Sequence, residues 1–250
     1  MTALRLGAFL GVFALVALWE ALAPFRRTAR DRWSANLGLI VLDSVLVRLL
    51  GPVSAVGAAV LAQRHGWGLL SALDLTGWGS GVATVVAMDF SIWTQHLVMH
   101  RVPLLWRLHR MHHADRGFDV TTGIRFHPGE MVFSVLWKAG SVLVLGASPV
   151  AVVVFEALLS AASLFEHANA SLPKRLDTAL RLLIVTPDMH RIHHSPVPAE
   201  TNSNYGFLLA IWDRLWRTYR AHGSGAAIGL ERFRAPADQH FLALLGQPFR

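Results

Sequence analysis

The sequence predicts an all-α integral membrane helical bundle that carries its histidines on the cytoplasmic side. The chain has 250 residues, of which 53% are hydrophobic and only 16% are charged, and its mean hydropathy is +0.42. These values are more apolar than those of a typical soluble domain. Thirteen histidines are present and cysteine is absent. The lack of cysteine excludes disulfides, thiolate-held metals and cysteine nucleophiles, so any metal must be held by nitrogen or oxygen.

The first apolar run, 4–23, has the length of one membrane-spanning helix and contains a single acid, Glu20. A secretory signal peptide is the alternative interpretation. The run is long for such a signal, and no small-residue cleavage site precedes the basic cluster that follows. That cluster is typical of a cytoplasmic anchor and comprises Arg26, Arg27, Arg30 and Arg32.

Three further apolar segments follow. Run 37–62 is interrupted by charged residues and by Gly51-Pro52, which predicts one kinked spanning helix. Run 82–100 predicts a helix that ends in histidines. Run 131–165 exceeds one span and is broken at Ser148-Pro149, which predicts a helical hairpin whose two ends face the same side.

Basic residues alternate with these segments in the way that the positive-inside rule requires. They concentrate after the first segment, after the third and after the hairpin, whereas the loop after the second segment holds only Arg64. The net charge of +7 is thereby explained by membrane topology, and no nucleic-acid partner is predicted. The protein is expected to be a multi-pass membrane protein.

Ten of the histidines fall in short clusters that this topology places at the cytoplasmic membrane face. Histidines spaced by three or four residues share one face of a helix, where two imidazoles can reach one metal ion. The ten predicted metal ligands are His96, His100, His109, His112, His113, His127, His167, His190, His193 and His194. A basic, pH-sensitive surface is the alternative interpretation of these clusters. His65, His222 and His240 stand alone and are interpreted as ordinary histidines.

Ten imidazoles exceed what one metal ion can use, so we expect two ions with about five ligands each. Imidazole suits iron, zinc and copper alike, and the ligand type by itself does not choose between them.

The ordered motifs resemble the fatty acid hydroxylase and sterol desaturase superfamily. They are His96-Leu-Val-Met-His100, His109-Arg-Met-His112-His113, Arg125-Phe-His127-Pro128, His167-Ala-Asn169, His190-Arg-Ile-His193-His194, Asn204-Tyr205-Gly206 and Trp212-Asp213-Arg214. The resemblance implies a membrane anchor of four or more helices, a cytosolic helical histidine-rich dome and a di-iron centre held by the ten histidines. One departure is Leu97, where an arginine commonly follows the first histidine.

The same resemblance implies an O2-dependent oxidoreductase that hydroxylates or desaturates a C–H bond of a lipid, such as a sterol or fatty acyl substrate. Two iron ions fit this chemistry because dioxygen activation needs a metal that supplies electrons, which zinc cannot do. The chain contains no nucleotide-binding motif, so a separate electron donor protein is expected. The expected parts are membrane-spanning helices in 1–88, a catalytic domain in 89–222 and a tail in 223–250.

Four polar residues are candidates for supporting the ligands. Asp89 shares a helical stripe with His96 and His100, and Asn169 follows His167 by two residues. The other two are Asp188 and Asp213. Their alternative interpretations are a buried ion pair, a helix cap and a surface salt bridge.

Two other function classes are compatible with clustered histidines. A zinc-dependent membrane hydrolase normally uses about three protein ligands and a catalytic carboxylate, and here acids are scarce. A non-enzymatic haem or metal-binding membrane protein places its ligands across the membrane depth, whereas these lie on one side. Both are less favoured than the oxygenase.

Overall fold

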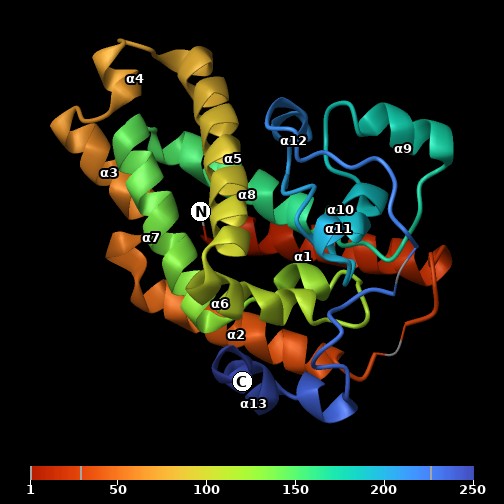
Figure 1. The fold of residues 1–250 in the computed structure, drawn as a ribbon. Helices are drawn as coiled ribbons and strands as arrows, with labels where there is room; N and C mark the ends of the chain where they lie inside the picture. The colour runs from red at the N-terminus through yellow and green to blue at the C-terminus, as the bar shows by residue number, and fades with distance from the viewer. Residues whose placement is uncertain (1, 29, 226) are drawn as a thin grey trace.

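The computed structural model describes residues 2–28, 30–225 and 227–250. Within these residues the chain is helical, with two isolated β-bridges and no β-strand (Figure 1), which confirms the predicted all-α class. The α-helices are α1 (Thr2–Leu22), α2 (Trp33–Leu49), α3 (Ala55–His65), α4 (Leu69–Ala72), α5 (Gly77–Arg101), α6 (Pro103–His113), α7 (Pro128–Leu145), α8 (Pro149–Glu166), α9 (Lys174–Leu180), α10 (Pro187–His193), α11 (Pro198–Thr201), α12 (Ile211–Leu215) and α13 (Phe241–Gly246). Short 3-10 helices are η1 (Gly51–Val53), η2 (Thr122–Ile124), η3 (Pro236–Gln239) and η4 (Gln247–Phe249).

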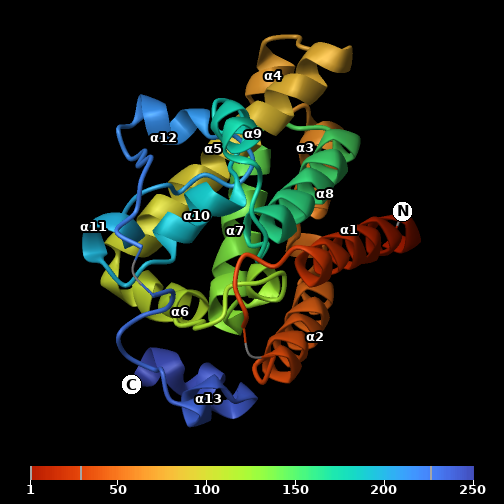
Figure 2. The ribbon, with the colours of Figure 1, turned by 90° about the vertical axis from the view of Figure 1, so that its right-hand side faces the viewer.

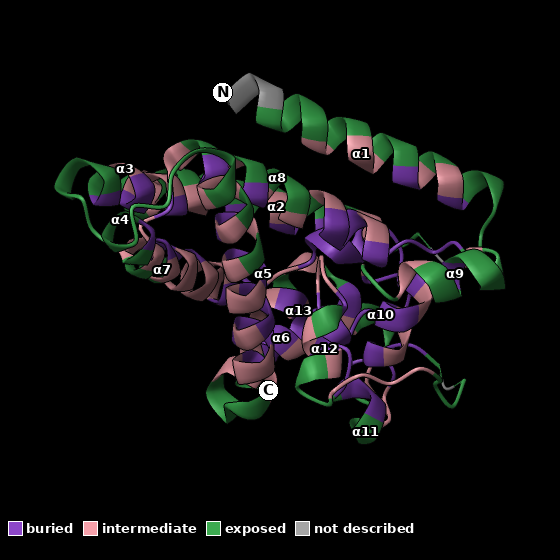
Figure 3. Cartoon of the chain, turned by 90° about the horizontal axis from the view of Figure 1, so that it is seen from above, coloured by how far each residue is buried: buried purple, intermediate pink, exposed green. Residues whose placement is uncertain are grey.

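Four helices are long and apolar enough to cross a membrane: α1, α5, α7 and α8. Helix α1 lies along one side of the molecule with much of its surface exposed (Figure 3), and Leu15 on this helix is 68% exposed. Such apolar surface suits contact with lipid tails. The protein is therefore a multi-pass helical membrane protein.

The break predicted at Ser148-Pro149 separates two helices, α7 and α8. Helix α7 ends at Gly146, which adopts the left-handed conformation (φ 71°) that glycine accepts without strain. Ser148 then caps α8 by accepting a hydrogen bond from the Ala151 amide at 3.2 Å, and Pro149 occupies the first helical position. The local sequence thus dictates the reversal.

The prediction of one kinked helix over 37–62 is wrong, because the chain forms two separate helices there. Helix α2 ends at Leu49, η1 contains Pro52, and Ser54 caps the start of α3 through the Gly57 amide. Proline cannot donate the backbone hydrogen bond that a continuous helix needs, and the serine cap offers a new start instead. With 17 and 11 residues, neither helix is among the four candidate spans.

Helices α3 and α5 each pack against α7 and α8 through a core of small and apolar side chains. Ala59, Met88, Val142 and Phe155 each have at most 1% exposure in this core. Beyond the end of α5, helix α6 turns sideways and α10 lies beside this corner (Figures 1 and 2). The corner is where the histidines gather.

The segment 223–250, predicted as a tail, contains short helices that pack on the body of the protein. Leu244 in α13 is fully buried with Leu39 of α2 and Met111 of α6. Arg110 donates a hydrogen bond to the Gln247 carbonyl at 2.6 Å. The C-terminal segment therefore packs against α6 and holds it in place.

Candidate metal centre

The corner between α5 and α6 brings the first two histidine motifs together. His96 and His100 lie one turn apart near the end of α5. Val102 is extended and Pro103 starts α6 at once, so the chain bends sharply and the end of α6 returns to α5. His96 and His109 consequently meet, with their Nε2 atoms 3.0 Å apart.

Helices α8 and α10 supply the remaining histidines of the cluster. His167 follows the last residue of α8, and α10 carries His190 and His193 with His194 as its C-cap. Thr186 caps α10 by accepting a hydrogen bond from the Met189 amide at 3.3 Å, and Pro187 follows as the first helical residue. A good cap lets this short helix form with its histidines facing α6.

Nine of the ten predicted histidines fall into two groups, within each of which the potential ligand atoms lie within 4.8 Å of one another. The five-histidine group contains His96, His100, His109, His113 and His193. The four-histidine group contains His112, His167, His190 and His194. The groups adjoin, because the rings of His113 and His194 stack with their centroids 4.5 Å apart. Helices α6 and α10 each contribute to both groups.

The outward ring nitrogens of five histidines are held by oxygen acceptors. Nδ1 of His96 donates to the Tyr205 carbonyl at 2.8 Å, and Nδ1 of His193 donates to the Ser203 carbonyl at 2.7 Å. The other three pairs are His112 with the Arg125 carbonyl, His167 with the Ser163 carbonyl and His109 with the Glu130 carboxylate. A carbonyl oxygen can only accept, so Nδ1 carries the proton and Nε2 keeps its lone pair. This arrangement is typical of histidines that bind metal.

The inward Nε2 atoms fit a metal ion. Nε2 of His167 lies 3.1 Å from that of His112 and 3.1 Å from that of His190, and the His193–His96 distance is also 3.1 Å. Two nitrogens bound at right angles to one ion, with bonds of about 2.1 Å, would be about 3.0 Å apart. Lone pairs facing one another at this distance repel unless a cation lies between them, so the donor set suits a metal ion.

Burial keeps these imidazoles neutral. Removal from water, reinforced by neighbouring histidines, lowers the pKa of His194 and His112 well below the ordinary value. Burial lowers the pKa of His193 to about 3 and that of His167 to about 4. Neutral imidazole is the metal-binding form, so the cluster needs no deprotonation at neutral pH.

His127 does not join either group. Its Nδ1 accepts the Gly129 amide at 3.0 Å, which makes it the N-cap of α7, and its Nε2 lies 3.2 Å from the Leu245 carbonyl. Both ring nitrogens are therefore used in holding α7 and the C-terminal segment. The three solitary histidines, His65, His222 and His240, also lie outside both groups.

Of the four predicted supporting residues, Asp213 reaches the cluster indirectly. Its carboxylate accepts the amides of Tyr205 and Gly206, each at 2.8 Å, and so fixes the carbonyl that holds His96. Burial raises the pKa of Asp213. The structure shows no hydrogen bond or ion pair between any of these four residues and a described histidine.

The other three hold neighbouring segments. Asp89 accepts the Leu209 amide at 3.1 Å and Nε1 of Trp212 at 2.8 Å, which fixes α12 to α5. Asp188 is ion-paired with Arg191. The Asn169 side-chain amide donates to the Arg26 carbonyl at 2.8 Å and ties the His167 loop to the end of α1.

Sequence reasoning missed two buried glutamates beside the histidines. Glu130 lies 2.8 Å from Nδ1 of His109 and orients that ring. Glu166 is fully buried, and its Oε1 lies 3.7 Å from Nδ1 of His167 and 3.8 Å from Nε2 of His190. The available signal was that these two acids directly flank the apolar run 131–165, each next to a predicted histidine motif.

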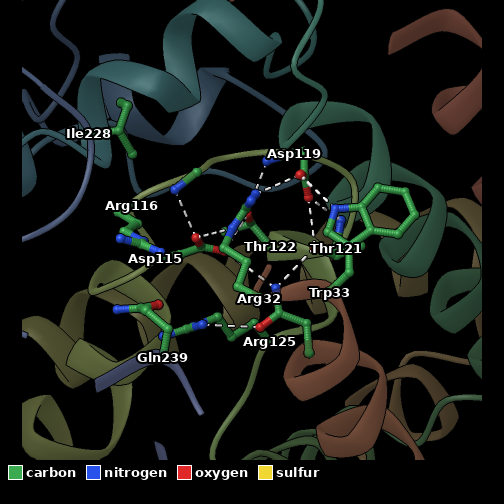
Figure 4. Close-up of polar contacts among 12 residues, drawn as sticks. Arg32, Trp33, Asp115, Arg116, Asp119, Thr121, Thr122, Arg125, Ile228 and Gln239 are labelled. Carbon is green, nitrogen blue, oxygen red and sulfur yellow. Dashed lines mark hydrogen bonds and ion pairs between the residues drawn. The ribbon is translucent and has the colours of Figure 1, made fainter. Parts of the chain in front are cut away.

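A polar network supports the loop after α6. Asn36 donates to Thr121 Oγ1 at 2.9 Å, and Arg125 donates to Asn36 Oδ1 at 3.0 Å. Arg32, expected in a cytoplasmic basic anchor, is fully buried between Asp115 and Asp119 (Figure 4). Burial would raise the pKa of Asp115, but the cations Arg32 and Arg125, with hydrogen bonds, outweigh it and hold the value at about 2.

A cavity of about 210 Å³ leads from the five-histidine group into the apolar helices. His96 and His109 line one part of it, and Ile92, Met131 and Phe207 are among its apolar walls. The cavity is lined by residues of α1, α5, α7 and α8, which are the four candidate spans. An apolar molecule from a bilayer could therefore reach the histidines without crossing water.

Comparison with known proteins agrees with this arrangement. The model of the fatty acid hydroxylase family matches residues 81–218. The chain is 29% identical to the ornithine lipid hydroxylase OlsE of Rhizobium tropici over 96% of this chain and 74% of that protein. It is 28% identical to the alkylglycerol monooxygenase of Xenopus tropicalis over 74% of this chain and 41% of that protein, and 27% identical to the human alkylglycerol monooxygenase over 58% and 32%.

This chain thus spans less than half the length of those monooxygenases. No solved structure matches. Because the family model covers more than half of the 250 residues and includes every histidine of both groups, this chain belongs to the fatty acid hydroxylase family.

Proposed function

We propose that the protein is a membrane-bound oxygenase that hydroxylates or desaturates a C–H bond of a lipid, using O2 and electrons from a separate donor protein. The observation that carries this proposal is the pair of adjoining histidine groups, of which the five-histidine group borders an apolar cavity between candidate membrane spans. The relatives named above are a lipid hydroxylase and lipid monooxygenases. Lipid oxidation therefore agrees with family, cavity and donor set.

The two groups would each hold one metal ion, and we propose that both ions are iron. Iron there would supply the electrons and the Lewis acidity that dioxygen activation needs. The chain's own part is to orient the rings: for five of the nine histidines, carbonyls or Glu130 hold Nδ1 outward, so that Nε2 points inward. The apolar cavity walls exclude water and align the lipid chain with the five-histidine group.

The experiment compares membranes containing the wild-type protein with membranes containing His194→Ala. Each is supplied with an ornithine lipid or an alkylglycerol, with an electron-donor extract, in air or under nitrogen, and lipids are analysed by mass spectrometry. We expect a product with one added oxygen, or with two hydrogens fewer, only for the wild-type protein in air. Oxidation that is independent of O2 or of His194 would contradict the proposal, and hydrolysed lipid in zinc-loaded samples would favour the hydrolase.

We also propose that the histidine groups face the cytoplasm, because basic residues follow α1, α5 and α8. A reporter fused after Arg250 should then give a cytoplasmic signal. A reporter signal from the opposite side of the membrane would contradict this orientation.

A further inference from the structure

The cavity beside the five-histidine group contains more unpaired acid than an apolar lipid channel needs. Asp43 of α2 and Glu130 of α7 both line it, together with His96 and His109. The chain as a whole carries a net charge of +7, so a cavity with an excess of acidic side chains is unusual for this protein.

Asp43 is the clearest part of this surplus. Its side chain is 3% exposed, and neither carboxylate oxygen has a hydrogen-bond partner among the described residues. It belongs to a mostly apolar helix, in which its neighbours Val41, Leu42 and Val45 are exposed. Burying a carboxylate without a partner is energetically costly. A ligand that supplies the missing partner would therefore be bound strongly.

Among the described residues that line the cavity, no lysine or arginine is left to neutralise Asp43. Glu130 uses Oε1 to hold His109, and its Oε2 has no partner among the described residues. The one lysine that lines the cavity, Lys138, is paired with Glu156 at 3.3 Å, and Arg5 is paired with the same Glu156. Two carboxylates therefore face a cavity whose lining lysine is already engaged with a third acid.

We propose that Asp43 binds a positively charged amino group of the lipid substrate, so that the enzyme selects amine-bearing lipids. The proposal rests on the proposed function and names the substrate class for that same cavity. An ammonium group donates three hydrogen bonds and brings the charge that Asp43 lacks, whereas a hydroxyl group supplies only one donor and no charge. The unpaired oxygen of Glu130 offers a second acceptor in the same cavity.

The test uses one amine-bearing lipid in two forms, an ornithine lipid and the same lipid with its amine acetylated. Acetylation removes the charge and leaves the acyl chains unchanged. Wild-type protein, Asp43→Asn and Ser160→Ala are compared for lipid oxidation in vesicles and, separately, for lipid retained by the detergent-solubilised protein in native mass spectrometry. Ser160 lines the same cavity, but its hydroxyl donates to the Glu156 carbonyl of its own helix.

We expect wild-type protein and Ser160→Ala to prefer the free amine by about tenfold or more in both measurements. Asp43→Asn should lose this preference because it retains and oxidises less of the free-amine lipid, while its metal content stays at the wild-type value. An unchanged preference in Asp43→Asn overturns the inference, as does a preference that shifts instead in Lys138→Met, which would indicate an anionic ligand.

The two measurements separate this inference from the proposed function. Asp43-dependent retention without oxidation of either lipid would support the amine site and contradict the oxygenase. Oxidation of both forms at equal rates by wild-type protein would support the oxygenase and contradict the amine site.

Discussion

The guanidinium of Arg32 is ion-paired with the carboxylate of Asp115, and neither side chain has any exposed surface. Asp115 stands two residues after His113, the last residue of α6, whereas Arg32 precedes α2. The pair therefore fixes the segment that enters α2 to the segment that leaves the second histidine motif. Arg32, which is far from the histidines in sequence, thus stabilises the loop that follows α6.

Replacing Arg32 with methionine should destabilise the protein by roughly 3–5 kcal/mol, because Asp115 and Asp119 would remain buried without their cation. Denaturant unfolding in detergent micelles, with metal content measured in parallel, checks this. Arg27→Met is the matched control, since Arg27 is exposed and should change stability by no more than about 0.5 kcal/mol. Equal unfolding midpoints for the two variants would refute the role given to Arg32.

Gly117→Ala should disturb the same pair from the other side. A Cβ atom added at Gly117 would lie 1.7 Å from Cζ of Arg32, so the buried guanidinium would have to move. We expect a loss of roughly 1–3 kcal/mol or more in the same unfolding measurement. Gly140→Ala, where nothing lies within 4 Å of the added atom, should be neutral or slightly stabilising because alanine favours the helix. A Gly117→Ala protein as stable as wild type would show that this contact is not tight.

Three histidine variants separate ligands from scaffold. His194→Ala should release metal from the four-histidine group, because it removes one of the four imidazoles that would hold the ion. His127→Ala should keep its metal and lose about 1 kcal/mol of stability, since it removes the N-cap of α7. His222→Ala should be nearly silent in both respects. The measurement is the metal content per folded chain of each variant. Loss of metal in His127→Ala would show that His127 is a tenth ligand.

Glu166→Gln should weaken metal binding by about 10- to 100-fold. Its carboxyl group is fully buried beside His167 and His190, and both of its oxygens are without a hydrogen-bond partner among the described residues, so they are available to the rings of the four-histidine group. Titration of metal-free protein against a chelator measures the affinity. Glu156→Gln on the same helix is the control, because Glu156 pairs with Lys138 and Arg5 instead. Equal affinities in the two variants would show that Glu166 is only a packing residue.

The local sequence was sufficient where a helix and its ends depend on neighbouring residues. The break between α7 and α8 was predicted from the Ser148-Pro149 pair, and the helical class from the apolar runs. The prediction for 37–62 was wrong because hydropathy runs through this segment, whereas Pro52 interrupts the helix and Ser54 caps a new one. Histidines four residues apart share a group, whereas pairs three residues apart, such as His109 and His112, fall in different groups.

The sequence by itself therefore determined that this is a helical membrane protein with clustered histidines, and those properties follow from composition and short-range spacing. Only the tertiary structure decided that nine histidines divide into groups of five and four, that His127 lies outside both, that Glu130 holds His109 and that Arg32 is buried beside Asp115. These outcomes depend on contacts between residues up to about a hundred positions apart, such as His96 with His193. Such contacts are set by how helices pack against one another, and local periodicity carries no information about that packing.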